Sequence, residues 1–72
     1  MAKDFSKLIG LIYEKYGSRK AFCEELGKPP EWLSRRLNNQ VQFDANDMIA
    51  IMDLLGIDPK NINTYFLTPN VL

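Results

Sequence analysis

Apolar residues recur every three or four positions along most of the chain, the spacing that places side chains on one face of an α-helix. The clearest stripe lies near the N-terminus and consists of Phe5, Leu8, Ile9, Ile12 and Tyr16. Asp4 suits the positive end of a helix, and Gly17 suits the position after its last turn. The pattern predicts a first helix over residues 4–16.

Two shorter stripes predict helices over residues 18–26 and 30–37. Ser18 can cap the first of them, and Gly27 can end it because glycine adopts the left-handed conformation without strain. Pro30 suits the first turn of the next helix, where its missing N–H costs nothing. Cys23 is interpreted as a small packing residue rather than a reactive thiol. The side chains expected to face inward are those of Ala21, Phe22, Leu26, Leu33 and Leu37, with Trp32 covering a flank.

The second half of the chain predicts two more helices. Asp44 can cap the first of these, and Asp47 lies three residues later, which is the spacing of a capping box. Gly56 marks the end of that helix, and Asp58-Pro59 opens a fifth one. The side chains expected in the core from this half are Met48, Ile51, Met52, Leu55, Ile62, Tyr65 and Phe66.

These elements predict an all-α fold with five helices in one compact domain over residues 1–72, with a helix-turn-helix at residues 18–38. A chain of 72 residues supports a single small core. Residues 67–72, interrupted by Pro69, are expected to form a flexible tail. Tyr65, Phe66 and this tail either complete the core or form a dimer contact.

The charges balance overall but not along the chain. Nine Lys and Arg are matched by nine Asp and Glu, whereas a dedicated DNA-binding domain is usually basic. Residues 1–36 hold eight of the basic and five of the acidic residues, and residues 37–72 hold one basic and four acidic residues. One part of the surface is therefore expected to attract phosphate, and another to repel it.

The residue types that are missing argue against several function classes. Histidine is absent and Cys23 is the single cysteine, so no common general base, disulfide or metal cluster is indicated. No phosphate-binding glycine loop or nucleophile triad is visible, and we expect no enzyme activity, cofactor or small-molecule substrate. The sequence shows no signal peptide and no long apolar run, which predicts a cytoplasmic protein without membrane contact.

Two short motifs carry a resemblance to a known family. They are KAFCEELG at residues 20–27 and LSRRLN at residues 33–38. Placed between the flanking helices, they resemble the phage repressor and Cro-like (XRE-type) helix-turn-helix family, and within it the small temperate-phage regulators. The similarity covers roughly residues 5–66. It implies a transcription regulator of a lysis/lysogeny switch in the cytoplasm of a host bacterium.

In that family the third helix enters the major groove of DNA, where its outward side chains contact base edges. The resemblance places DNA- or partner-binding side chains at Lys28, Pro30, Glu31, Ser34, Arg35, Asn38, Asn39 and Gln40. It implies a bidentate contact of Arg35 with guanine and a contact of Asn38 with adenine or phosphate. The side chains expected to act through charge, on phosphate or on a partner, are Arg19, Lys20, Arg36, Asp44 and Asp47.

The chain departs from the family pattern where the third and fourth helices begin. Pro29-Pro30-Glu31 replaces small polar or amide residues and brings a carboxylate toward the groove. Lys28 stands where the turn usually holds an aliphatic residue. Asp44 and Asp47 stand where the fourth helix often offers N–H groups to phosphate, and a carboxylate within about 5 Å of a phosphate opposes binding by roughly 1 kcal/mol across water.

Three functions fit these observations. The first is an anti-repressor that binds a partner repressor, alone or jointly on DNA, because acidic side chains around a Pro/Trp patch complement a basic DNA-binding face. The second is a Cro-like operator binder acting as a dimer. The third is an antitoxin-type or other protein-interaction module. Plainer interpretations also stay open: Trp32 as cover of the core, the two aspartates as helix caps, and Arg35 and Arg36 as a solvated face. The first function is preferred modestly over the second.

Overall fold

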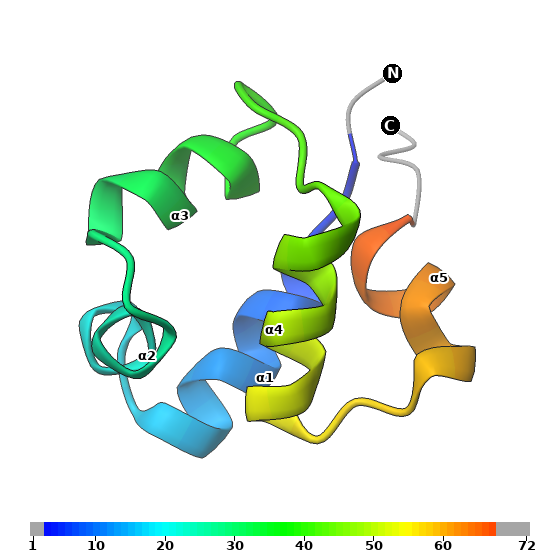
Figure 1. Ribbon diagram of the computed structural model, residues 1–72, viewed down its shortest axis with the longest axis horizontal. Helices are drawn as coiled ribbons and strands as arrows, with labels where there is room; N and C mark the ends of the chain where they lie inside the picture. The colour runs from blue at the N-terminus through cyan, green and yellow to red at the C-terminus, as the bar shows by residue number, and fades with distance from the viewer. Residues whose placement is uncertain (1–2, 68–72) are drawn as a thin grey trace.

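The computed structural model describes residues 3–67, in which five α-helices and one 3-10 helix follow one another (Figure 1). They are α1 (Ser6–Tyr16), α2 (Arg19–Leu26), α3 (Pro30–Leu37), α4 (Ala45–Leu55), the 3-10 helix η1 (Pro59–Asn61) and α5 (Ile62–Phe66). The all-α class with five helices is confirmed. Helices α2 and α3, with the turn at residues 27–29, occupy the predicted helix-turn-helix.

The helix boundaries follow from local hydrogen bonds that the sequence predicts. The Ser18 hydroxyl accepts a hydrogen bond from the Ala21 N–H at 3.1 Å, which caps α2. Gly27 ends α2 with φ 79°, and the N–H groups of Gly27 and Lys28 both donate to the Cys23 carbonyl. This left-handed turn changes the direction of the chain so that α3 can pack against α2.

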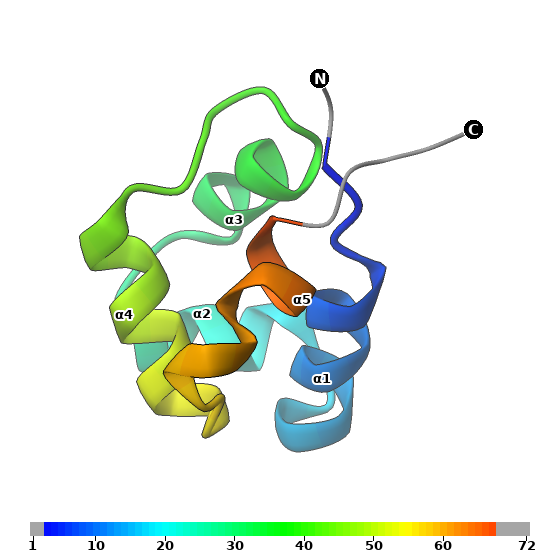
Figure 2. The same cartoon turned by 90° about the vertical axis from the view of Figure 1, so that its right-hand side faces the viewer.

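Helix α3 lies at one end of the molecule. Figure 1 shows α2 and α3 on one side of α4 and α5 on the other, and the turned view of Figure 2 shows α3 above the remaining helices. Helix α1 packs against α2, α4 and α5, whereas the main packing partner of α3 is α2. The outer face of α3 is therefore left open to solvent.

The core is apolar and has Phe43 at the junction of several elements. The Phe43 ring makes edge-to-face contacts with Phe5 and Phe66, with 5.4 Å between ring centroids in each pair, and lies 6.2 Å from the Trp32 ring. Such pairs add about 0.5–1.5 kcal/mol each to the burial of their area. The fully buried side chains are Phe22, Phe66, Leu8, Ile12, Leu33, Ile51, Leu55 and Cys23.

The first helix begins two residues later than the periodicity predicts. Asp4 is not its first residue. Instead, the Asp4 carboxylate accepts hydrogen bonds from the Ser6 N–H at 2.9 Å and the Ser6 hydroxyl at 2.6 Å, and Phe5 occupies the capping position. These bonds hold the pKa of Asp4 below its usual range, the hydroxyl bond contributing most. Asp4 therefore stabilises the start of α1 from outside the helix.

The C-terminal region also differs in detail from the prediction. The fifth helix is split, because the Asp58 carboxylate accepts the Lys60 N–H at 3.0 Å and the chain forms the tight turn η1 before α5. Phe66 is 1% exposed, so it completes the core rather than forming a dimer contact. Met48, Ile62 and Tyr65, expected in the core, are half-buried and pack against it. Of the flexible tail predicted over residues 67–72, only Leu67 belongs to the described residues, and the rest lies outside them.

Candidate partner or nucleic-acid interface

The outer face of α3 carries four of the predicted site residues. Pro30, Glu31 and Arg35 are exposed, and Ser34 is half-buried between them. Pro30 stands at the first helical position, and Glu31 follows it near the positive end of the helix dipole. This face of α3 is therefore accessible from solvent.

Arg35 is paired on this face with an acidic neighbour. Its Nη2 lies 2.7 Å from Glu31 Oε1 one helical turn away, and the two side chains are 56% and 72% exposed. The i, i+4 spacing brings them together, and exposed pairs of this kind contribute little to stability. The guanidinium that would contact a guanine therefore already has a carboxylate partner within α3.

Arg36 has a different role from its neighbour. Its guanidinium lies 4.0 Å from the Trp32 ring centroid, Nη1 donates to the Trp32 carbonyl at 3.2 Å, and Nε lies 3.6 Å from Asp47 Oδ2. The Arg36 and Asp47 side chains are only 16% and 15% exposed. Both were predicted to act on phosphate or a partner through charge, yet their charges are engaged with each other inside the fold.

The N-terminus of α3 offers few donors to a phosphate. Pro29 and Pro30 have no backbone N–H, and the Trp32 N–H donates to the Pro29 carbonyl at 3.0 Å. Lys28, in the turn, places its ammonium 5.4 Å from the Trp32 ring centroid. Its stem leans toward the ring while the residue stays exposed.

The start of α4 is closed in a similar way. The Asp44 carboxylate accepts the Asp47 N–H at 2.8 Å, and the Asp47 carboxylate accepts the Asp44 N–H at 3.3 Å, so the predicted capping box is present. Two amide donors at this helix end are thus occupied by carboxylates. Asp44 is exposed, so its charge is presented to solvent.

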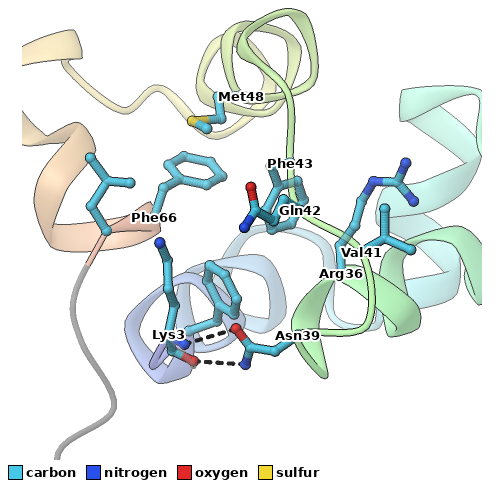
Figure 3. A pocket seen from close by; sticks show the side chains of 10 residues that line it. Lys3, Arg36, Asn39, Val41, Gln42, Phe43, Met48 and Phe66 are labelled. Carbon is cyan, nitrogen blue, oxygen red and sulfur yellow. Dashed lines mark hydrogen bonds between the residues drawn. The ribbon is translucent and has the colours of Figure 1, made fainter. Parts of the chain in front are cut away.

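The segment after α3 turns on Asn39. This residue has φ 65°, and its side-chain amide accepts the Lys3 N–H at 2.8 Å and donates to the Lys3 carbonyl at 3.0 Å (Figure 3). The predicted site residues Asn38 and Gln40, on either side, are exposed. Asn39 was predicted as a binding residue, and its amide is committed to the backbone near the N-terminus.

The remaining predicted residues lie on α2. Arg19 is half-buried at the first position of the helix, and Lys20 is exposed next to it. Of the basic residues proposed for phosphate contacts, Lys20 and Lys28 are therefore the more accessible ones.

Two hollows flank the loop between α3 and α4, and the sequence did not indicate either as a unit. The Trp32 hollow, about 360 Å³, is lined by Pro29, Glu31, Trp32, Arg35, Arg36 and Val41. The Phe43 hollow, about 400 Å³, is lined by Lys3, Phe5, Arg36, Asn39, Val41, Gln42, Phe43, Met48, Phe66 and Leu67 (Figure 3). The sequence feature that could have indicated them is the apolar Val41 between two glutamines in a loop.

A model of the family described as "Protein of unknown function (DUF739)" matches residues 1–69. The chain belongs to this family. Among solved structures, this DUF739 chain is similar to the solution structure of the modulator of repression (MOR) of the temperate bacteriophage TP901-1 from Lactococcus lactis. The two are 29% identical, the match covers 100% of this chain and 97% of that one, and the TM-score is 0.83. No curated protein matches the DUF739 chain.

The resemblance to small temperate-phage regulators is confirmed by this solved structure, which is that of a phage modulator of repression. The relative is a phage regulatory protein rather than an enzyme. No helix within residues 3–67 of the DUF739 chain combines the length and apolar character needed to cross a membrane. Over that same range, no group of three or more His, Cys, Asp or Glu side chains is arranged to hold a metal ion.

Proposed function

We propose that this protein regulates a phage lysis/lysogeny switch as an anti-repressor, binding a partner repressor alone or jointly on DNA through its helix-turn-helix surface. Two independent lines support the proposal. The fold is similar over its whole length to a phage modulator of repression. The outer surface of α3 has features that suit a basic protein partner better than a phosphate backbone.

The observation that carries the proposal is how the exposed start of α3 is built. Glu31 is 72% exposed, its carboxylate pairs with Arg35, and the two preceding prolines remove N–H donors. A DNA-binding surface gains most of its affinity from cations and amide donors near phosphate. Here the cation is shared with a carboxylate, and a carboxylate close to a phosphate costs roughly 1 kcal/mol.

A repressor's own DNA-binding face has the complementary chemistry. That face is basic, so it can pair with Glu31 and Asp44, which are both exposed. Asp47, by contrast, already pairs with Arg36 and contributes little to the outward charge. Trp32, half-buried beside the Trp32 hollow, supplies apolar contact area of the kind that dominates interfaces.

The test is co-purification with the repressor encoded beside it, followed by a gel shift with each protein and with the mixture. We expect a stable complex with the repressor and weak operator binding by this chain alone. Nanomolar, sequence-specific binding by this chain alone at about 150 mM salt would exclude the anti-repressor interpretation.

A substitution at Arg35 tests the surface itself. Arg35→Ala should weaken partner or DNA binding by about 1–3 kcal/mol while leaving the melting temperature nearly unchanged, because the side chain is outward and its ion pair is exposed. Lys60→Ala is the matched control, since Lys60 forms an exposed pair with Asp58 at 3.8 Å in η1, a segment that lies on the other side of α4 from α3 (Figure 1). Equal effects of the two substitutions on binding would contradict the proposal.

A second candidate is a Cro-like operator binder acting as a dimer. It is favoured by the common outward placement of Ser34, Arg35 and Asn38 along α3, which is how a recognition helix presents its side chains to base edges. The same gel shift separates the two, because a Cro-like protein binds its palindromic site without the repressor.

A further inference from the structure

Val41 forms a ridge between two concave surfaces. It is 40% exposed in the loop between α3 and α4, and it lines both the Trp32 hollow and the Phe43 hollow. Arg36 also lines both, beneath the ridge. Its guanidinium packs on the Trp32 ring and lies 3.6 Å from Asp47, so the side chain that the two hollows share is enclosed in the fold.

The Phe43 hollow has an apolar floor and a polar rim. Figure 3 shows the Phe43 and Phe66 rings and the Met48 side chain around it, with Lys3 and Gln42 at its edge. Leu67, 42% exposed, lies at the rim as well. An apolar side chain fits the floor, and a carboxylate beside it would meet the Lys3 ammonium.

The Trp32 hollow belongs to the α3 surface. Glu31 and Arg35 stand on its rim, and the Trp32 ring forms its apolar part. A basic group on a partner would meet the exposed Glu31 carboxylate there, which Arg35 also contacts at 2.7 Å. Because Val41 and Arg36 line both hollows, the two form one surface, with the Glu31–Arg35 pair in the Trp32 hollow and Lys3 in the Phe43 hollow.

We propose that the partner repressor docks across Val41 and inserts one apolar side chain into each hollow, so that the Phe43 hollow extends the binding surface beyond α3. This inference rests on the proposed function, in which the repressor binds the α3 face, because the Trp32 hollow is part of that face. The repressor segment carries a basic group toward Glu31 and an acidic group toward Lys3. Neither the family resemblance nor the sequence motifs place any contact at Lys3, Val41 or Leu67.

The experiment compares three aspartate substitutions in the full chain. Val41→Asp and Leu67→Asp each place a charge on the proposed surface. Ile49→Asp is the matched control, because Ile49 is 54% exposed on α4 and lines neither hollow. All three sites are exposed, so we expect the variants to fold, and circular dichroism checks this before binding is measured.

Binding to the purified repressor is measured by titration calorimetry. We expect Val41→Asp and Leu67→Asp to weaken binding about tenfold or more, and Ile49→Asp to stay within about twofold of the unsubstituted protein. If Val41→Asp or Leu67→Asp binds like the control, the two-hollow surface is wrong, while intact binding of the unsubstituted chain still upholds the proposed function. If the unsubstituted chain does not bind the repressor, the proposed function itself fails.

Two other occupants are distinguished by the same variants. If Val41→Asp converts a dimer of this chain to a monomer and repressor affinity is unchanged, the surface belongs to a second copy and the inference is overturned. If Val41→Asp weakens operator binding alone, the surface meets DNA and the inference is overturned in the same way. Sedimentation and gel-shift measurements on the three variants supply these readouts.

Discussion

Arg35 and Arg36 are adjacent in sequence, and the structure predicts opposite consequences for their loss. In Arg36→Ala the protein loses the stacking on Trp32 at 4.0 Å, the hydrogen bond to the Trp32 carbonyl at 3.2 Å and the ion pair with Asp47. The Asp47 carboxylate, 15% exposed, is left without its cation. A side chain this well enclosed contributes to stability, whereas the exposed Arg35 contributes to binding.

The size of the effect follows from the separate contacts. A cation over an indole ring contributes about 1 kcal/mol, and a charged donor on a carbonyl about 1.5 kcal/mol. The ion pair is long and adds little by itself, but removing one partner leaves the other partly desolvated. We expect Arg36→Ala to lower the free energy of unfolding by about 2–3 kcal/mol and the melting temperature by roughly 10–20 °C.

Urea unfolding followed by far-ultraviolet circular dichroism measures this loss without relying on Trp32 fluorescence, which the substitution also changes. Arg35→Ala is the control and should cost less than about 0.5 kcal/mol. A double-mutant cycle with Asp47→Asn isolates the coupling between the two side chains. A loss for Arg36→Ala no greater than that for Arg35→Ala would refute the assignment of a structural role.

Three further predictions concern the loop and the core. Asn39→Ala should lower the free energy of unfolding by about 1–2 kcal/mol, because it removes both hydrogen bonds to Lys3 and places alanine at φ 65°. Asn39→Gly should lower it less, because glycine accepts that conformation. Urea titrations that show no loss of stability in either variant would contradict this. Burial raises the pKa of the Cys23 thiol, and the charge of Arg19 opposes this shift. Because the thiol is also 1% exposed, thiol reagents should label it only as fast as the protein opens. Labelling as rapid as that of a free thiol would refute this. At a pH above the ordinary pKa of a thiol, the thiol of the unfolded chain is ionised while the buried one stays protonated. The free energy of unfolding should therefore fall as the pH rises through this range, and Cys23→Ala should abolish that part of the fall.

The sequence predicted those parts of the fold that depend on neighbours in the chain. Helix ends and helix caps depend on residues a few positions apart. The structure has the predicted ends at Gly17, Gly27 and Gly56 and the predicted caps at Ser18 and Asp44. The Glu31–Arg35 and Trp32–Arg36 contacts were also within reach, since both pairs have the i, i+4 spacing. The spacing alone does not select them, because the same side chains also suit contacts with DNA or a partner.

Contacts between distant segments were out of reach. Asn39 and Lys3 are 36 positions apart, and Arg36 meets Asp47 only because the loop between α3 and α4 brings α4 back toward α3. No periodicity in the sequence encodes these distances. They change the candidate site most, because they remove Arg36, Asn39 and Asp47 from the freely available polar groups and bring Val41 and Lys3 into one surface.

The two hydrogen bonds between the Asn39 side chain and the Lys3 backbone also bear on how the protein ages. The side-chain amide stands in for a backbone peptide unit, giving one donor and one acceptor to Lys3. Deamidation would turn the donating nitrogen into a carboxylate oxygen, which faces the Lys3 carbonyl and cannot donate to it. A single slow chemical change at a loop asparagine would therefore release the segment that borders the Phe43 hollow.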